Sequence, residues 1–202
     1  MPYIPRHAIQ VANVLAGLLI TLSTSAADMD NRFAPENQAR ELIELWSKTC
    51  LQHFRDPSAL RDAARHAGYL ENPPNADSML NGAKGTVWDA SSSPFSQRVL
   101  VSLDVGGCEI RGQIARSDVV QQEFAQGVES LASADTEVKQ VSNQKSADKF
   151  VDQRQQIYGV NDKATGKKWL FGAGTSESLL TRTQAVITVA PADAVEKRAP
   201  RP

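Results

Sequence analysis

The chain is poor in the residues that carry most catalytic chemistry. It has 2 cysteines and 3 histidines among 202 residues, and aromatic residues make up 6% of it. It also lacks an excess of either charge, because 22 lysines and arginines face 23 aspartates and glutamates. Such a balance gives no electrostatic reason to bind nucleic acid or anionic lipid. We therefore expect no nucleic acid among its partners.

Long apolar runs are also scarce, and the clearest lies near the N-terminus at residues 11–22. It follows the basic Arg6 and leads into small residues that end at Ala27. This order is typical of a secretion signal, cleaved here after Ala26 or Ala27. A membrane-spanning helix needs about 20 apolar residues, so the run is too short for an anchor. We predict a signal peptide over residues 1–27, an exported domain over 28–190, and no stable membrane insertion after cleavage.

Apolar spacing next predicts two helices. Over residues 36–54 the apolar residues recur at helical intervals, with Trp46 and Cys50 on the same side. Asp56 and Pro57 are residue types favoured at the N-cap and first position of a second helix, which Gly68 would end. Because two or three residues separate the helices, we predict an N-terminal helical hairpin.

The periodicity changes to that of strands after a loop at residues 71–82. We expect strands at 85–89, 98–104 and 108–114, and then a third helix capped by Ser117 or Asp118. A loop over 133–148 with one edge strand at 137–141 precedes strands at 155–160, 168–171 and 184–189. Residues 191–202 should form a flexible tail. The order predicts a single α+β domain, in which the hairpin and the further helix pack on a mostly antiparallel sheet.

The two cysteines allow three interpretations. Export favours a disulfide between Cys50 and Cys108, which would fasten the first helix to the sheet. Cys50 and His53 also lie one helical turn apart, a spacing compatible with a metal, although Cys108 has no cysteine near it in sequence. Two free thiols are the third interpretation. We predict the disulfide, and neither a metal nor a cofactor.

Catalytic motifs are incomplete. His53 and His66 are the histidines available as bases after the signal, and no serine lies in a Gly-x-Ser-x-Gly turn. The residues around Gly166 have neither the spacing of a phosphate loop nor the oxygen ligands of a calcium loop. Glu41 and Glu44 lie on the polar side of the first helix. We therefore assign no catalytic residue.

Some residues would nevertheless suit a binding groove or a hydrolase. Trp88 and Trp169 have faces that can line a sugar or peptide groove, but each lies in a predicted strand, where a core role is commoner. Asp104 and Glu109 flank the Gly106-Gly107 turn. A pocket that gathers two of Asp104, Glu109, His53 and His66 beside either tryptophan would favour hydrolysis.

Several of these features occur together in one known group of proteins. The pattern consists of a helix with Trp46 and Cys50, Asp56-Pro57 before a second helix, Trp88 on a strand, and Gly107-Cys108 before a capped helix. Over about residues 39–124 it resembles small, uncharacterised periplasmic proteins of Gram-negative bacteria. The resemblance implies the periplasm and brings no activity and no site residues.

The expected function is therefore a non-enzymatic one. We expect a periplasmic protein that binds another envelope or secreted protein, for example along an exposed strand edge in the C-terminal half. An immunity-type protein that blocks a secreted toxin is a specific form of this hypothesis. The alternatives are a small envelope hydrolase and a small-ligand binder with an apolar concavity between the third helix and the sheet.

Overall fold

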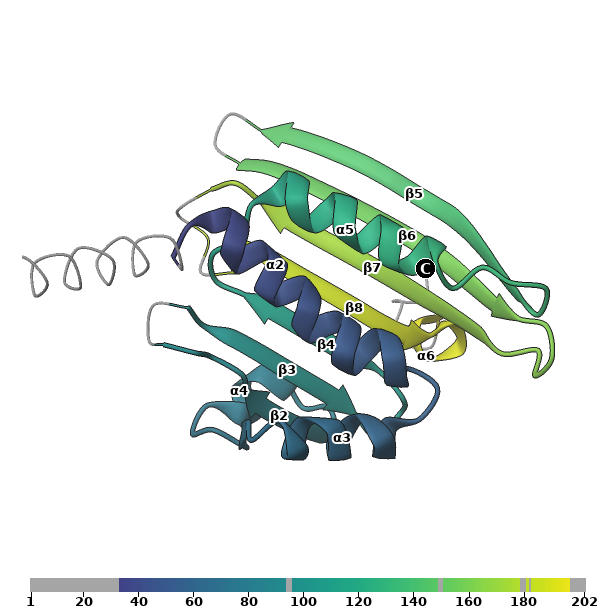
Figure 1. Cartoon of the computed structure of the whole chain (residues 1–202), viewed down its shortest axis with the longest axis horizontal. Helices are drawn as coiled ribbons and strands as arrows, with labels where there is room; N and C mark the ends of the chain where they lie inside the picture. The colour runs from purple at the N-terminus through teal and green to yellow at the C-terminus, as the bar shows by residue number, and fades with distance from the viewer. Residues whose placement is uncertain (1–32, 94–95, 149–150, 179–180, 182, 197–202) are drawn as a thin grey trace, which may run out of the picture.

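The computed structural model describes residues 33–93, 96–148, 151–178, 181 and 183–196. The described residues form an eight-stranded antiparallel sheet in the order β1-β2-β3-β4-β8-β7-β6-β5 (Figure 1). The predicted α+β class with an antiparallel sheet is confirmed. The strands are β1 (Leu70–Glu71), β2 (Gly85–Asp89), β3 (Arg98–Leu103), β4 (Cys108–Gly112), β5 (Thr136–Asp148), β6 (Val151–Asp162), β7 (Lys168–Ser176) and β8 (Ala185–Pro191). The helices are α2 (Pro35–Trp46), the π-helix η1 (Ser47–Leu51), α3 (Pro57–His66), α4 (Ala76–Leu80), α5 (Ser117–Glu129) and α6 (Ala192–Glu196).

Helices α2 and α5 lie side by side across one face of the sheet (Figure 1). Pro35 opens α2, where its missing backbone N–H costs nothing. The ring centroids of Trp46 and Phe124 lie 5.2 Å apart between the two helices. Tyr158 of β6 follows, with its ring centroid 5.9 Å from that of Phe124. These buried rings fill the space between the helices and the sheet.

Helix α3 begins as predicted but packs elsewhere than expected. The Asp56 carboxylate accepts hydrogen bonds from the backbone N–H groups of Ser58 and Ala59, at 3.0 and 3.1 Å. Pro57 follows at the first helical position. The helix then contacts η1 and β3 rather than lying along α2 (Figure 1). The predicted helical hairpin is therefore not confirmed.

The segment predicted as a loop at residues 71–82 contains helix α4. This short helix covers the sheet face opposite α2 and α5, at β2 and β3. It forms because Ala76, Met79 and Leu80 pack against Val87 and Val101. This packing is a tertiary interaction and not a local one. The sequence around the helix therefore does not need, and does not show, an extended helical periodicity.

Two further segments are more regular than predicted. Strand β5 spans 136–148, although only residues 137–141 were expected to be extended. Because β5 is the outermost strand of the sheet, its sequence is mostly polar. It therefore lacks the alternation of apolar and polar residues that marks a half-buried strand. Residues 192–196, which lie in the stretch 191–202 predicted as a flexible tail, form α6 against β7 and β8. The predicted signal peptide at 1–27 lies outside the described residues.

Candidate functional site

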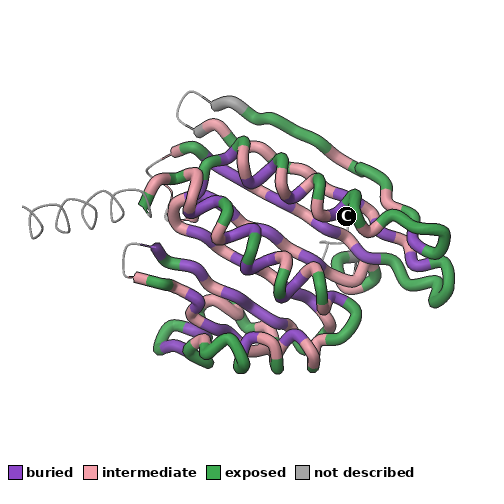
Figure 2. Tube along the Cα trace, in the orientation of Figure 1, coloured by how far each residue is buried: buried purple, intermediate pink, exposed green. Residues whose placement is uncertain are grey.

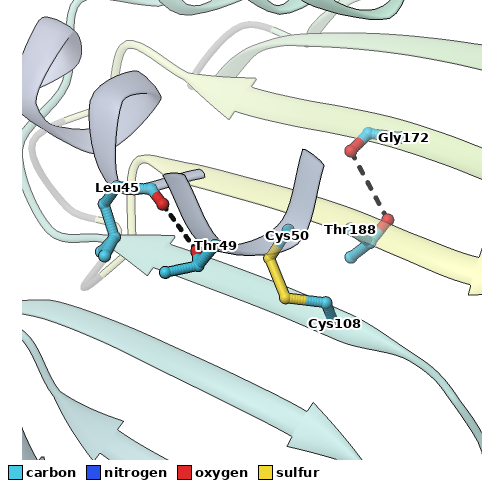
Figure 3. The surroundings of a disulfide bond; sticks show 6 residues. All are labelled: Leu45, Thr49, Cys50, Cys108, Gly172 and Thr188. Atoms are coloured by element: carbon cyan, nitrogen blue, oxygen red, sulfur yellow. Dashed lines mark hydrogen bonds between the residues drawn. A yellow bond between two sulfur atoms is a disulfide. The ribbon is translucent and has the colours of Figure 1, made fainter. Parts of the chain in front are cut away.

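The structure brings the two cysteines to disulfide distance. Cys50 on η1 reaches Cys108 at the start of β4, and their Cα atoms lie 5.6 Å apart (Figure 3). Beside them the Thr49 hydroxyl donates a hydrogen bond to the Leu45 carbonyl, at 2.6 Å. The cysteines are 0% and 4% exposed, so the pair is a cross-link inside the core. Within the described part of the chain, no group of three or more His, Cys, Asp and Glu side chains is arranged to hold a metal.

The four residues proposed for hydrolysis are scattered. The Nδ1 atom of His66 lies 2.7 Å from the carbonyl oxygen of Asp62 on the exposed side of α3, while His53 lies at the end of the first helical segment. Glu109 forms an ion pair with Arg111 in its own strand. Asp104 is thus the one of the four that lines a pocket together with Trp169.

The remaining candidates are structural. Trp88 is fully buried in the core. Glu41 forms an ion pair with the buried guanidinium of Arg98, and Glu44 forms one with Lys48 on the surface. None of these arrangements presents a free carboxylate pair. The predicted concavity between the third helix and the sheet is occupied by the aromatic rings described above.

The pocket that contains Trp169 lies at the end of the sheet where several chain turns meet, and we call it the turn-end pocket. Its volume is about 620 Å³, and its floor is formed by Pro57, Gly106, Trp169 and Pro191. Gly106 has a φ of +90°, a conformation that the turn between β3 and β4 requires and that side chains disfavour. A Cβ atom added there would lie 3.5 Å from Cγ of Pro191 and 4.0 Å from both Cγ of Pro57 and Cη2 of Trp169. Three rings from distant parts of the chain therefore converge on one turn.

Exposed apolar surface continues from this floor. Val105, at the tip of the same turn, is 59% exposed. Trp169 is held in place from behind by Phe54, whose ring centroid lies 5.1 Å away in an edge-on arrangement. Trp169 itself is 6% exposed, so the apolar patch at the pocket mouth comes from Val105 and from the edge of the indole ring.

Charged residues surround this patch. Arg55 forms an ion pair with Asp162, at 3.3 Å, and Asp104 forms one with Arg61. Hydrogen bonding from the backbone N–H of Thr165, followed by the charge of Arg55, lowers the pKa of Asp162. Asp162 thereby stabilises the turn between β6 and β7.

That turn leads directly to two lysines on the pocket rim. Lys167 and Lys168 are exposed, and among the residues that the structure describes neither forms an ion pair. Asp193 of α6 is the remaining charged residue of the rim. The rim therefore carries two lysine charges that no described ion pair neutralises.

The edge strand β5 is a second candidate surface. It has 13 residues, whereas β1 at the other edge of the sheet has 2 residues. Strand β5 pairs with β6 on one side only. Figure 2 shows β5 exposed along most of the part whose burial is described. A β-bulge interrupts its register between Gln140 and Ser142, and Val141 at the bulge is 62% exposed. Lys139 and Lys145, together with the bulge, are features that protect an edge from indiscriminate pairing.

Comparison of the chain with protein-family models, with curated proteins and with solved structures gives no match. Among the described residues, no helix has both the length and the apolar character needed to cross a membrane. Two surfaces of the chain, the turn-end pocket and the edge strand, are therefore the candidates for a functional role.

Proposed function

We propose that this chain is an exported, periplasmic, non-enzymatic module that binds a segment of another protein along strand β5. The observation that carries the proposal is the length and exposure of this edge strand. An outer strand has backbone N–H and C=O groups without a strand partner, and an extended segment can pair with them. A strand of 13 residues exceeds the usual length of about 5–6, so it offers a long template.

Export is supported by the buried cysteine pair. Disulfides persist in oxidising compartments and are rare in the cytosol. A cross-link between Cys50 and Cys108 is therefore more useful to a protein that leaves the cytosol. The N-terminal segment with the features of a secretion signal points in the same direction.

Among the residues that the structure describes, the candidate catalytic side chains are not gathered, and this favours binding over hydrolysis. Hydrolysis needs an acid or base and a second group within reach of one substrate atom. Of His53, His66, Asp104 and Glu109, Asp104 alone lines the pocket beside Trp169, and its carboxylate is held by Arg61. Protein binding makes no such demand on geometry.

Site-specific photocrosslinking tests the edge directly, because the chain provides a matched control. A benzoylphenylalanine is placed at Val141 on β5, or at Leu70 on β1 at the opposite edge; these residues are 62% and 60% exposed. After irradiation of intact cells, we expect a defined protein adduct from position 141 and none from position 70. No adduct at 141, or equal adducts from both positions, would contradict the proposal.

A second variant tests whether strand pairing causes the adduct. Val141→Lys adds a charge at the bulge, and lysines on an edge strand oppose pairing. With the photocrosslinker moved to the exposed Asn143, this variant should give less adduct than the parent. Equal melting temperatures of the two proteins would show that the loss does not arise from unfolding.

A further inference from the structure

The apolar floor of the turn-end pocket is suited to one inserted side chain. Pro57, Trp169 and Pro191 surround Gly106 without a side chain at its centre, so the floor is a shallow, ring-lined depression. Val105 extends the apolar surface outward from it. Interfaces between proteins concentrate their binding energy in such places, where a rigid aromatic or aliphatic group enters a pocket and excludes water.

The charges of the rim determine what must accompany that side chain. Asp162 and Arg61 already neutralise Arg55 and Asp104 through ion pairs. Lys167 and Lys168 have no such partner among the described residues, and Asp193 is the one other acid on the rim. A carboxylate of the incoming segment would meet these two lysines, whereas a lysine or arginine would be repelled by them.

We propose that the turn-end pocket binds a peptide segment in which acidic residues flank an apolar or aromatic side chain. The apolar group lies against Trp169 and the two prolines, and the carboxylates lie near Lys167 and Lys168. This inference rests on the proposed function, because it names the chemistry of a partner protein. It concerns a surface distinct from β5, so the two claims are tested by different residues.

Peptide titration followed by nuclear magnetic resonance tests the inference on the exported form, residues 28–202. The probe is the blocked peptide GSLEEFGS. One control peptide carries Lys in place of both Glu residues, and a second carries Ser in place of Leu and Phe. We expect GSLEEFGS to shift the amide signals of Gly106 and Lys168 and the indole signal of Trp169, and both control peptides to shift them far less.

A charge-matched pair of variants assigns the binding to the rim. Lys167→Glu with Lys168→Glu should weaken binding of GSLEEFGS by roughly tenfold, since it replaces two exposed ion pairs with repulsion between like charges. Lys139→Glu with Lys145→Glu makes the same change of net charge on β5 and should leave the affinity unchanged. Raising the salt concentration should weaken binding to the parent by screening attraction, whereas in the pocket variant it screens repulsion and should not weaken binding.

The possible results separate the two claims. The inference is overturned, whatever the photocrosslinks show, if the pocket signals do not shift up to millimolar peptide. It is also overturned if the parent and the pocket variant bind the peptide with equal affinity. Binding at the pocket without a photocrosslink from β5 sustains the inference and overturns the edge-strand proposal. Loss of peptide binding in the β5 variant alone would show that the acidic segment binds the edge strand, and it would overturn the inference as well.

Discussion

Reduction of the cross-link between Cys50 and Cys108 should lower the free energy of unfolding by about 4 kcal/mol. The two residues are 58 positions apart in the sequence. For a closed loop of that size, the chain-entropy relation gives about 14 cal/mol/K, or about 4 kcal/mol at 25 °C. In this relation the loss comes from the greater freedom that the unfolded chain gains when the cross-link is broken. This is a large fraction of the stability of a typical domain, about 5–15 kcal/mol.

Urea unfolding of the chain, with and without reductant, measures the difference in unfolding free energy. Thiol titration of each sample establishes whether the cysteines are free. For a domain of this size, the same loss should lower the melting temperature by roughly 10 °C. The double variant Cys50→Ala with Cys108→Ala should lose at least as much stability without reductant, because it also leaves space in the core.

Hydrogen exchange identifies where the reduced protein loosens. The cross-link joins η1 to β4, so amides of these two elements should lose protection before those of β5 and β6. A reduced protein with free thiols whose unfolding free energy stays within about 1 kcal/mol of the oxidised form would refute the reasoning. Earlier loss of protection in β5 and β6 would refute the assigned role of the cross-link.

Three further predictions follow from buried contacts and from one titrating group. Gly127→Ala should cost about 1–2 kcal/mol in urea unfolding despite the better helix propensity of alanine, because its Cβ would lie 2.7 Å from Cζ3 of the buried Trp46; a stabilised variant would contradict this. Glu41→Gln should cost about 2 kcal/mol in the same assay, since it leaves the buried guanidinium of Arg98 without its carboxylate; an unchanged unfolding midpoint would count against it. The lowered pKa of Asp162 adds stability above about pH 4 that is lost as the pH falls through the folded-state pKa, so Asp162→Asn should destabilise the protein at pH 7 and much less at pH 3. An equal loss at both pH values would show that ionisation contributes nothing.

Local signals in the sequence were sufficient for the elements that are stabilised locally or that are rich in β-branched residues. The Asp56-Pro57 start of α3 is an example, since the cap consists of contacts within a few residues. Strands such as β2 and β3, buried by helices on both faces of the sheet, were also predictable from their β-branched residues. In contrast, α4 depends on packing against Val87 and Val101 across the sheet, and its own five residues are too few for a periodic signal.

The candidate surfaces were less accessible to sequence reasoning. An exposed edge in the C-terminal half was expected, but the polar residues of β5 gave no measure of its length. The turn-end pocket was not predicted, because Pro57, Gly106, Trp169 and Pro191 come from four separate elements or turns. The sequence does contain a signal for Asp104 and Trp169 as site residues, because each lies beside a turn at the end of a strand.

The cross-link and the turn-end pocket are connected through the chain itself. Cys108 closely follows Gly106 in the chain, and Cys50 precedes Arg55 and Pro57, which line the same pocket. We therefore expect the same bond to position both groups of lining residues, although no sulfur lines the cavity. If so, a sample reduced but still folded in the absence of urea should bind GSLEEFGS more weakly than the oxidised protein, and β5 should keep its photocrosslink. Equal peptide affinity in the two redox states would show that the pocket walls are held by their own packing, by contacts such as that between Phe54 and Trp169.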